Sequence, residues 1–239
     1  MEFTTTQTVA EIVASDYRTA DVFKSFGIDF CCGGKAKLED ICRRKELDSA
    51  EVLSALTQLF NSDQTAPDFK SWKADQLIRY IVENHHQYIT KNIGIIREYA
   101  KKVALVHGLH RPEVVQIADL FEEIAKELLT HLQKEEIVLF PYILDLQQAA
   151  EGNGQLLQDR FTTVQSPIRM METEHETVGN WFHQIAEFSN QYNPPAEACN
   201  TFIVLYAKLK EFEEDLHTHI HLENNLLFPM ALQLEKNIR

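Results

Sequence analysis

A segment that occurs twice constrains this chain more than any other feature of its sequence. Residues 131–141 read HLQKEEIVLFP and residues 219–229 read HIHLENNLLFP, so His, Glu, Leu, Phe and Pro coincide at an offset of 88 residues. A further histidine precedes each copy, because His86 is 45 residues before His131 and His175 is 44 residues before His219. The repeat predicts two similar pairs of helices related by a pseudo-twofold axis.

The chain from residue 72 onward has the pattern of long helices. Chain breakers are few, since the 239 residues include only 8 Gly and 7 Pro. Apolar residues recur at helical spacing in four stretches, about 72–107, 112–140, 166–192 and 195–229. Prolines lie at the edges of these stretches, and we expect Pro141 and Pro229 to mark the ends of the second and fourth helices. Four such helices with polar connections predict an all-α four-helix bundle.

The first sixty residues predict a small helical domain in front of the bundle. The segments Thr8–Glu11 and Asp48–Glu51 resemble capping boxes that open short helices, and Gly27 is placed to stop a helix at Phe26. The polar segment 61–68 is typical of a linker. We therefore expect a small helical domain over residues 1–60, a linker over 61–71 and the bundle over 72–239.

Composition restricts the partners. Lys and Arg number 23 against 36 Asp and Glu, and the net charge of −13 disfavours a surface for nucleic acid or anionic membranes. No apolar run is long enough to span a bilayer, and the first residues lack the basic and apolar regions of a secretory signal. We expect a cytoplasmic protein with no nucleic-acid and no membrane partner.

The repeated motif has the chemistry of a metal site. Residues four apart on a helix lie about 6 Å apart along its axis on one face, so His131 faces the same way as Glu135, and His219 the same way as Glu223. With one upstream histidine from each half, four imidazoles and two carboxylates meet inside the bundle. Burying them is costly unless cations compensate them, which a pair of divalent metal ions would do. The predicted ligands are His86, His131, Glu135, His175, His219 and Glu223.

The ligand types restrict the metal. None of the six residues is Cys, which a structural zinc site would usually recruit, and imidazole with carboxylate suits iron, manganese or zinc. If both glutamates bridge, octahedral iron keeps roughly two positions for a solvent bridge and an external ligand. His85 stays an alternative to His86, although the spacing favours His86.

Other polar residues near the motif are expected outside the metal site. On their helix, His217 and His221 point away from His219, which predicts surface positions for both. Glu174 and Glu176 flank His175 either as an outer layer of the site or as part of a solvated face, and we favour the solvated face.

Several motifs together give the chain a family resemblance. They are GIDFCCGG at residues 27–34, His131-x-x-x-Glu135, Glu172-x-Glu174-His175, and HxHLENNxLFP at residues 219–229. Residues 72–229 resemble a hemerythrin-like domain, and the whole chain resembles the iron–sulfur cluster repair di-iron family (RIC proteins, YtfE- or ScdA-like). The resemblance implies a hemerythrin-like four-helix bundle that holds two non-haem iron ions in an oxo- and carboxylate-bridged di-iron centre. The six residues above would be the ligands, with Glu135 and Glu223 as the bridges.

The same resemblance implies a function. It implies repair of iron–sulfur clusters damaged by oxidative or nitrosative stress, through iron donation or nitric oxide chemistry. Iron–sulfur cluster proteins would be the recipients, and nitric oxide or dioxygen the small ligands. Oxygen-carrying hemerythrins typically have a fifth histidine, which has no counterpart here and argues against simple oxygen carriage.

Two other functions stay open. One is a module that binds or senses oxygen or nitric oxide without turnover, and the other is a metal-stapled scaffold for a partner. A homodimer is compatible with each of these functions, and the sequence assigns a catalytic role to no residue.

The adjacent Cys31 and Cys32 form the second candidate site. Reactive thiols require exposure and a lowered pKa, and a disulfide between neighbouring cysteines needs a strained ring. The pair is therefore either a redox or iron-handling site or two ordinary thiols. Cys42 and Cys199 are expected in the apolar core.

Overall fold

The structure is a computed structural model that describes residues 3–15, 19–28, 30, 34–60, 68–152 and 163–238. Every regular element in these ranges is a helix, and the only strand-like feature among them is an isolated bridge between Thr8 and Lys37. The all-α fold class is therefore confirmed. None of the described helices has the length and apolar content needed to cross a membrane.

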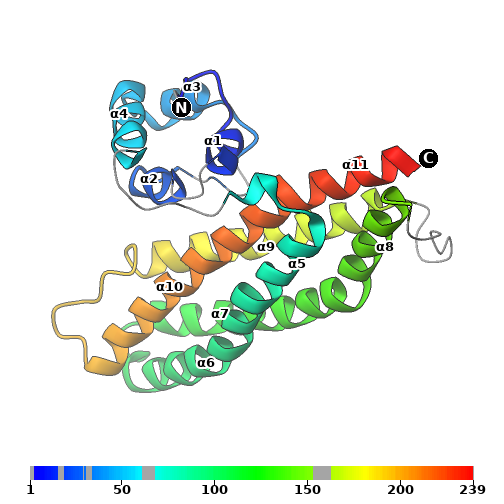
Figure 1. The fold of residues 1–239 in the computed structure, drawn as a ribbon. Coiled ribbons are helices and arrows are strands. Elements are labelled where there is room, and N and C mark those ends of the chain that lie inside the picture. The colour runs from blue at the N-terminus through cyan, green and yellow to red at the C-terminus, as the bar shows by residue number, and fades with distance from the viewer. Residues whose placement is uncertain are drawn as a thin grey trace.

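Four helical units build the bundle, and Figure 1 shows them lying side by side. Two of these units come from each half of the repeat, in the order α5 (Ala74–Tyr80) with α6 (Gln87–His107), α7 (Glu113–Lys134) with α8 (Phe140–Ala150), α9 (Gln165–Phe188), and α10 (Asn200–Leu222) with α11 (Phe228–Ile238). Widened π-helical turns join the two parts of the first, second and fourth units, namely η2 (Ile81–His86), η3 (Glu135–Leu139) and η4 (Glu223–Leu227).

The expected ends of the second and fourth helices are wrong. Pro141 and Pro229 lie in the first turns of α8 and α11, and the chain stays helical as far as Ala150 and Ile238. A proline inside a regular α-helix lacks the N–H and clashes with the carbonyl four residues before it. Here a π turn precedes each proline, and the wider turn accommodates the missing hydrogen bond.

The third helix is shorter than the sequence suggests. It ends at Phe188, because Asn190, Gln191 and Tyr192 all have left-handed backbone conformations, with φ of 51°, 57° and 60°. Three successive residues in this region are incompatible with a right-handed helix.

The first sixty residues form short helices that lie beside the bundle in Figure 1. These helices are α1 (Val9–Ser15), α2 (Thr19–Ser25), α3 (Leu38–Lys45) and α4 (Ser49–Phe60). The capping box of α1 is present: the Thr8 N–H donates to Glu11 Oε2 at 2.8 Å, and the Glu11 N–H donates to Thr8 Oγ1 at 3.2 Å. Asp48 Oδ1 accepts from the Ala50 N–H at 2.8 Å. Gly27, with φ of 63°, makes the turn after α2.

The segment between α2 and α3 packs directly on the bundle. Phe30 is buried, and its ring lies 5.8 Å from that of His217 and 6.1 Å from that of His221, both on α10. Lys35 forms an ion pair at 3.1 Å with Glu172 on α9. The division into 1–60, 61–71 and 72–239 stays a prediction, since residues 61–67 lie outside the described ranges.

Two separate apolar clusters make up the core. The larger cluster combines the first sixty residues with one end of the bundle, including Ile93, Phe121 and Phe212. The smaller cluster lies at the other end and includes Leu77 and Ile143. On each helical unit one cluster gives way to the other near the ligand residues, for example between Ile81 and Ile89 around His86 and between Met171 and Val178 around His175, so these residues form a polar layer where the clusters meet.

Candidate metal centre

The six predicted ligands lie together in the polar layer between the two clusters. Each of the four helical units supplies one histidine, and the π turns η3 and η4 each begin with a glutamate. All six side chains are almost fully buried: His86, His131, Glu135, His175, His219 and Glu223.

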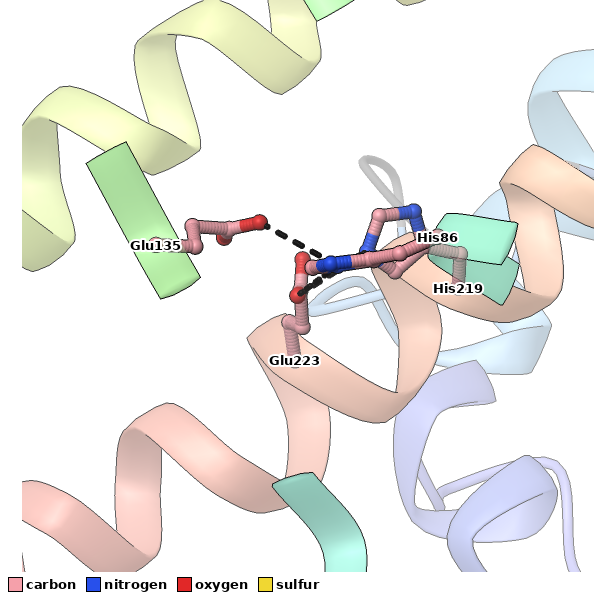
Figure 2. Close-up of side chains that lie close together, drawn as sticks. All are labelled: His86, Glu135, His219 and Glu223. Atoms are coloured by element: carbon pink, nitrogen blue, oxygen red, sulfur yellow. Dashed lines mark hydrogen bonds and ion pairs between the residues drawn. The ribbon is translucent and has the colours of Figure 1, made fainter. Parts of the chain in front are cut away.

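These side chains form two groups of four that share both glutamates. One group is His86, Glu135, His219 and Glu223, which point toward one another in Figure 2. The other is His131, Glu135, His175 and Glu223, and in each group the potential ligand atoms lie within 4.8 Å of one another. We name them the His86–His219 position and the His131–His175 position. Each position joins one histidine from each half of the repeat, so the halves must pack together to form either one.

Glu223 contacts both positions through its two oxygens. Its Oε1 lies 2.9 Å from His219 Nε2, and its Oε2 lies 3.2 Å from His175 Nε2. Burial by itself raises the pKa of Glu223, but the surrounding histidines, with His219 foremost, outweigh it and hold this pKa well below its usual range. Glu223 is therefore an ionised carboxylate that spans the two positions.

Glu135 spans the same two positions from the opposite side. Its Oε2 lies 3.5 Å from His86 Nε2, and its Oε1 lies 3.4 Å from His131 Nε2. Among the described residues, neither oxygen has a hydrogen-bond partner. Burial and the negative charge of Glu223 raise the pKa of Glu135 well above its usual range. A buried carboxyl group without donors is a group that a cation would satisfy by binding its ionised form.

Acceptors on the outside of the site orient three of the four histidines. Each donates its Nδ1–H outward, namely His86 to Glu136 Oε1 at 2.8 Å, His131 to Glu174 Oε2 at 2.8 Å and His175 to Asn224 Oδ1 at 3.0 Å. A neutral imidazole with a proton on Nδ1 has its lone pair on Nε2, which here faces the centre. This is the orientation that metal-binding histidines require.

Burial also favours the neutral form of two of these histidines. It lowers the pKa of His219 to about 3, and it lowers the pKa of His131. The imidazole nitrogens and the carboxyl oxygens thus face one another with few donors between them. Nitrogen and oxygen ligands of this kind fit iron, manganese or zinc, so the residues fit a pair of divalent cations.

The geometry favours His86 over His85. His85 is buried as well, but its Nδ1 donates to Asp215 Oδ1 at 2.9 Å, and it belongs to neither position. Its ring is nearly parallel to that of His219, with centroids 5.8 Å apart.

The expectation of a solvated face at Glu174 is wrong. Its side chain is only 13% exposed and binds both His131 and Lys134 of α7. Glu176 is exposed, as expected. The difference arises because α7 packs against the Glu174 side of α9, which the sequence of α9 alone does not reveal.

His221 also differs from its expected surface position. It is 2% exposed, its Nδ1 accepts from the Asn225 amide at 2.9 Å, and the Phe30 ring lies close to it. His217 is partly buried on the same side. The segment before the bundle covers this face of α10, and burial lowers the pKa of His221 to about 4.

The cysteines divide into three cases. Cys42 is buried as expected, but Cys199 is exposed at the start of α10, where its Sγ lies 3.3 Å from His107 Nε2. Cys199 is therefore not a core residue, because the loop before α10 leaves its first residues at the surface. Cys31 and Cys32 lie outside the described residues, and their role stays a prediction.

Two outer acceptors were not predicted, although the repeat contains a signal for them. Glu136 and Asn224 each follow a bridging glutamate directly, at the same place in the two copies of the repeat. In the structure each binds Nδ1 of the histidine that comes from the preceding helical unit, His86 or His175.

Comparison with known proteins places this chain in a family. The model of the hemerythrin HHE cation binding domain matches residues 77–231, and the model of ScdA_N, a domain of unknown function, matches residues 5–59. The iron-sulfur cluster repair protein ScdA of Staphylococcus haemolyticus is 32% identical over 92% of this chain and 95% of its own length.

Two further relatives show the same coverage. The iron-sulfur cluster repair protein YtfE of Musicola paradisiaca is 35% identical over 96% of this chain and 97% of its own. A probable iron-sulfur cluster repair protein of Haemophilus influenzae is 34% identical over 95% and 96%. The hemerythrin-like fold class is thereby confirmed, and a di-iron centre fits both the matched domain and the buried His and Glu groups. The chain belongs to the ScdA/YtfE family and carries a hemerythrin HHE cation-binding domain.

Proposed function

We propose that this protein holds two iron ions on His86, His131, Glu135, His175, His219 and Glu223, and that it supplies iron to damaged iron–sulfur clusters in other proteins. The observation that supports this most is the buried layer of inward-facing imidazoles around two shared carboxylates. Relatives of nearly equal length are named iron-sulfur cluster repair proteins.

The side chains of the site suit iron that is held and then released. Imidazole and carboxylate hold ferrous iron less tightly than thiolates hold softer metals. Bound iron would supply one-electron redox chemistry and exchangeable positions for nitric oxide or dioxygen. The Glu136 side chain is 44% exposed while it binds His86, so it connects the buried site with solvent.

The biological setting belongs to the proposal too. We place the protein in the cytoplasm, where it acts on iron–sulfur cluster proteins after oxidative or nitrosative stress, alone or as a homodimer. Cys31 and Cys32 are proposed to take part as redox-active or iron-handling thiols. Replacing both by Ser is then expected to leave the iron content unchanged and to slow iron transfer.

A transfer experiment tests the proposal. The iron-loaded protein is mixed under anaerobic conditions with a protein whose [4Fe–4S] cluster has been removed, together with sulfide, and cluster formation is followed by its absorbance. We expect faster reconstitution than with the same amount of ferrous salt. Equal rates, or a protein that binds only zinc, would contradict iron donation.

Metal content tests the ligand assignment separately. Glu223→Leu removes one bridging carboxylate and is expected to lower the iron content below two per chain. Glu98→Leu, at an exposed position on α6, is the matched control and should retain two.

A second candidate function is binding of nitric oxide or dioxygen without turnover. The four-histidine, two-glutamate set favours it to the extent that each iron keeps open positions. Reversible binding of either gas by a protein that transfers no iron would select this function.

A further inference from the structure

The two halves of the repeat do not support the two metal positions equally. The outer contacts of His86 and His175 match. Glu136 and Asn224 occupy equivalent places in the repeat, and each accepts a hydrogen bond from one of these histidines. The outer contacts of His131 and His219 do not match. His131 donates to Glu174, the residue directly before His175, whereas the residue directly before His86 is His85, which turns away to Asp215.

His219 is therefore the one ligand histidine without an outer acceptor. Its Nδ1 is buried and has no hydrogen-bond partner among the described residues. Beside His219, the atoms His85 Nε2 and Asp215 Oδ2 are also buried and have no hydrogen-bond partner within the described part of the chain. At the equivalent place around His131 the contacts are complete, because Glu174 binds both His131 and Lys134.

This difference changes how each position can hold a cation. To offer its Nε2 lone pair, His219 must give up the 2.9 Å contact with Glu223 as a hydrogen bond and leave an Nδ1–H buried without an acceptor. His131 meets no such cost, because Glu174 accepts its Nδ1–H and makes the imidazole a stronger ligand. Loss of an outer partner of this kind typically lowers metal affinity about 10–100-fold.

We propose that the two positions are inequivalent and that the His86–His219 position (Figure 2) is the one that gives up its iron. The inference rests on the proposed function for the meaning of that release. An iron held there would leave as Fe²⁺ with no electron transferred, and it would give up His86, His219 and its share of the two glutamates. Glu135 and Glu223 would then serve the second ion at the His131–His175 position alone.

Release kinetics test the inference without any repair assay. The full-length protein is loaded anaerobically with two equivalents of Fe²⁺ and mixed with excess ferrozine, and the absorbance of the complex is followed. We expect two phases of one iron each, with rates about 10–100-fold apart. A single phase that releases both irons overturns the inference.

Two variants assign the phases to positions. Glu174→Gln removes the charge of the acceptor behind His131 and is expected to accelerate only the slow phase. The double variant His85→Glu with Asp215→Asn gives His219 the carboxylate that the repeat has in its other half, and it should slow only the fast phase. Glu176→Gln, at the exposed glutamate on the other side of His175, is the matched control and should change neither phase.

The outcomes separate this inference from the proposed function. If the double variant does not fold, as judged by circular dichroism, the wild-type phases and Glu174→Gln still decide. Acceleration of the fast phase by Glu174→Gln would reverse the assignment and overturn it. Two phases without any transfer to a cluster protein would refute iron donation and leave the inequivalence standing, whereas transfer with a single phase would refute only the inequivalence.

Discussion

Replacing Glu135 by leucine is expected to stabilise the metal-free protein while it weakens metal binding. Both Glu135 oxygens are buried without a hydrogen-bond partner among the residues that the structure describes. Each such atom costs about 1–3 kcal/mol, so the carboxyl group destabilises the metal-free fold by roughly 2–6 kcal/mol. Leucine has a similar volume and no polar atoms. It therefore removes this cost and extends the apolar packing of the neighbouring Leu139 and Leu132.

The expected shift is large enough to measure. Near the midpoint, 1 kcal/mol corresponds to roughly 2–4 °C for a chain of this size. A gain of about 3 kcal/mol would therefore raise Tm by roughly 6–12 °C. Circular dichroism melts of chelator-treated Glu135→Leu and wild-type protein give the shift, and metal analysis of the untreated proteins gives the iron content.

The control is a glutamate with the opposite environment. Glu98→Leu on the exposed face of α6 should change the unfolding free energy by less than about 0.5 kcal/mol and leave the iron content unchanged. A metal-free Glu135→Leu protein that melts below wild type would show that Glu135 is well satisfied without a cation. Two irons per chain in this variant would show that Glu135 is not a ligand. Either result refutes the reasoning.

Three further predictions concern the cation site, His221 and Phe30. Metal removal should lower Tm, because a cation at about 1,000 times its Kd contributes roughly 4 kcal/mol per site. Calorimetry with and without Co²⁺ as the added divalent cation measures this change in Tm, and equal midpoints would contradict a buried cation site. Burial lowers the pKa of His221 to about 4, so its contribution to the free energy of unfolding is complete above pH 6.5 and is lost as pH falls toward 4. In urea titrations, the free energy of unfolding of wild type should fall by about 2 kcal/mol more than that of His221→Gln between pH 7 and pH 5. Equal losses in the two proteins would disprove this prediction. Phe30→Ala should cost about 3–4 kcal/mol in the same assay, and an unchanged midpoint would rule out its packing on α10.

The sequence was sufficient for the helices and for the inward-facing residues. The pairs His131–Glu135 and His219–Glu223 are set by the four-residue period of one helix, and the repeat links the two pairs. No knowledge of which helices are neighbours is needed to see that these side chains share a face. The partner histidines follow from the same repeat. The choice of His86 over His85 depended on its spacing of 45 residues from His131, which is nearer to the 44 residues between His175 and His219.

The features that could not be predicted depend on contacts between elements. Glu174 is held by α7 across the bundle, and no periodicity within α9 indicates that contact. His221 is buried because a segment about 190 residues earlier in the chain, at Phe30, covers it. Pro141 and Pro229 looked like helix ends because propensity treats every interior proline as a breaker, whereas the π turns around the site change the local geometry.

The division of the core into two apolar clusters has a consequence for how the molecule comes apart. The helical units run through both clusters, and the cations would add a cross-link at the layer where the larger cluster meets the smaller one. Without them, the layer between the clusters holds buried imidazoles and the Glu135 carboxyl group, which has no hydrogen-bond partner among the described residues. We therefore expect the smaller end to open at a lower free energy than the larger one. The rate of amide hydrogen exchange in α8 and α11 would then depend on whether metal is bound. In the metal-free protein, these helices would be the first to become accessible to proteolysis. We therefore expect the lifetime of the protein to depend on whether it still carries metal.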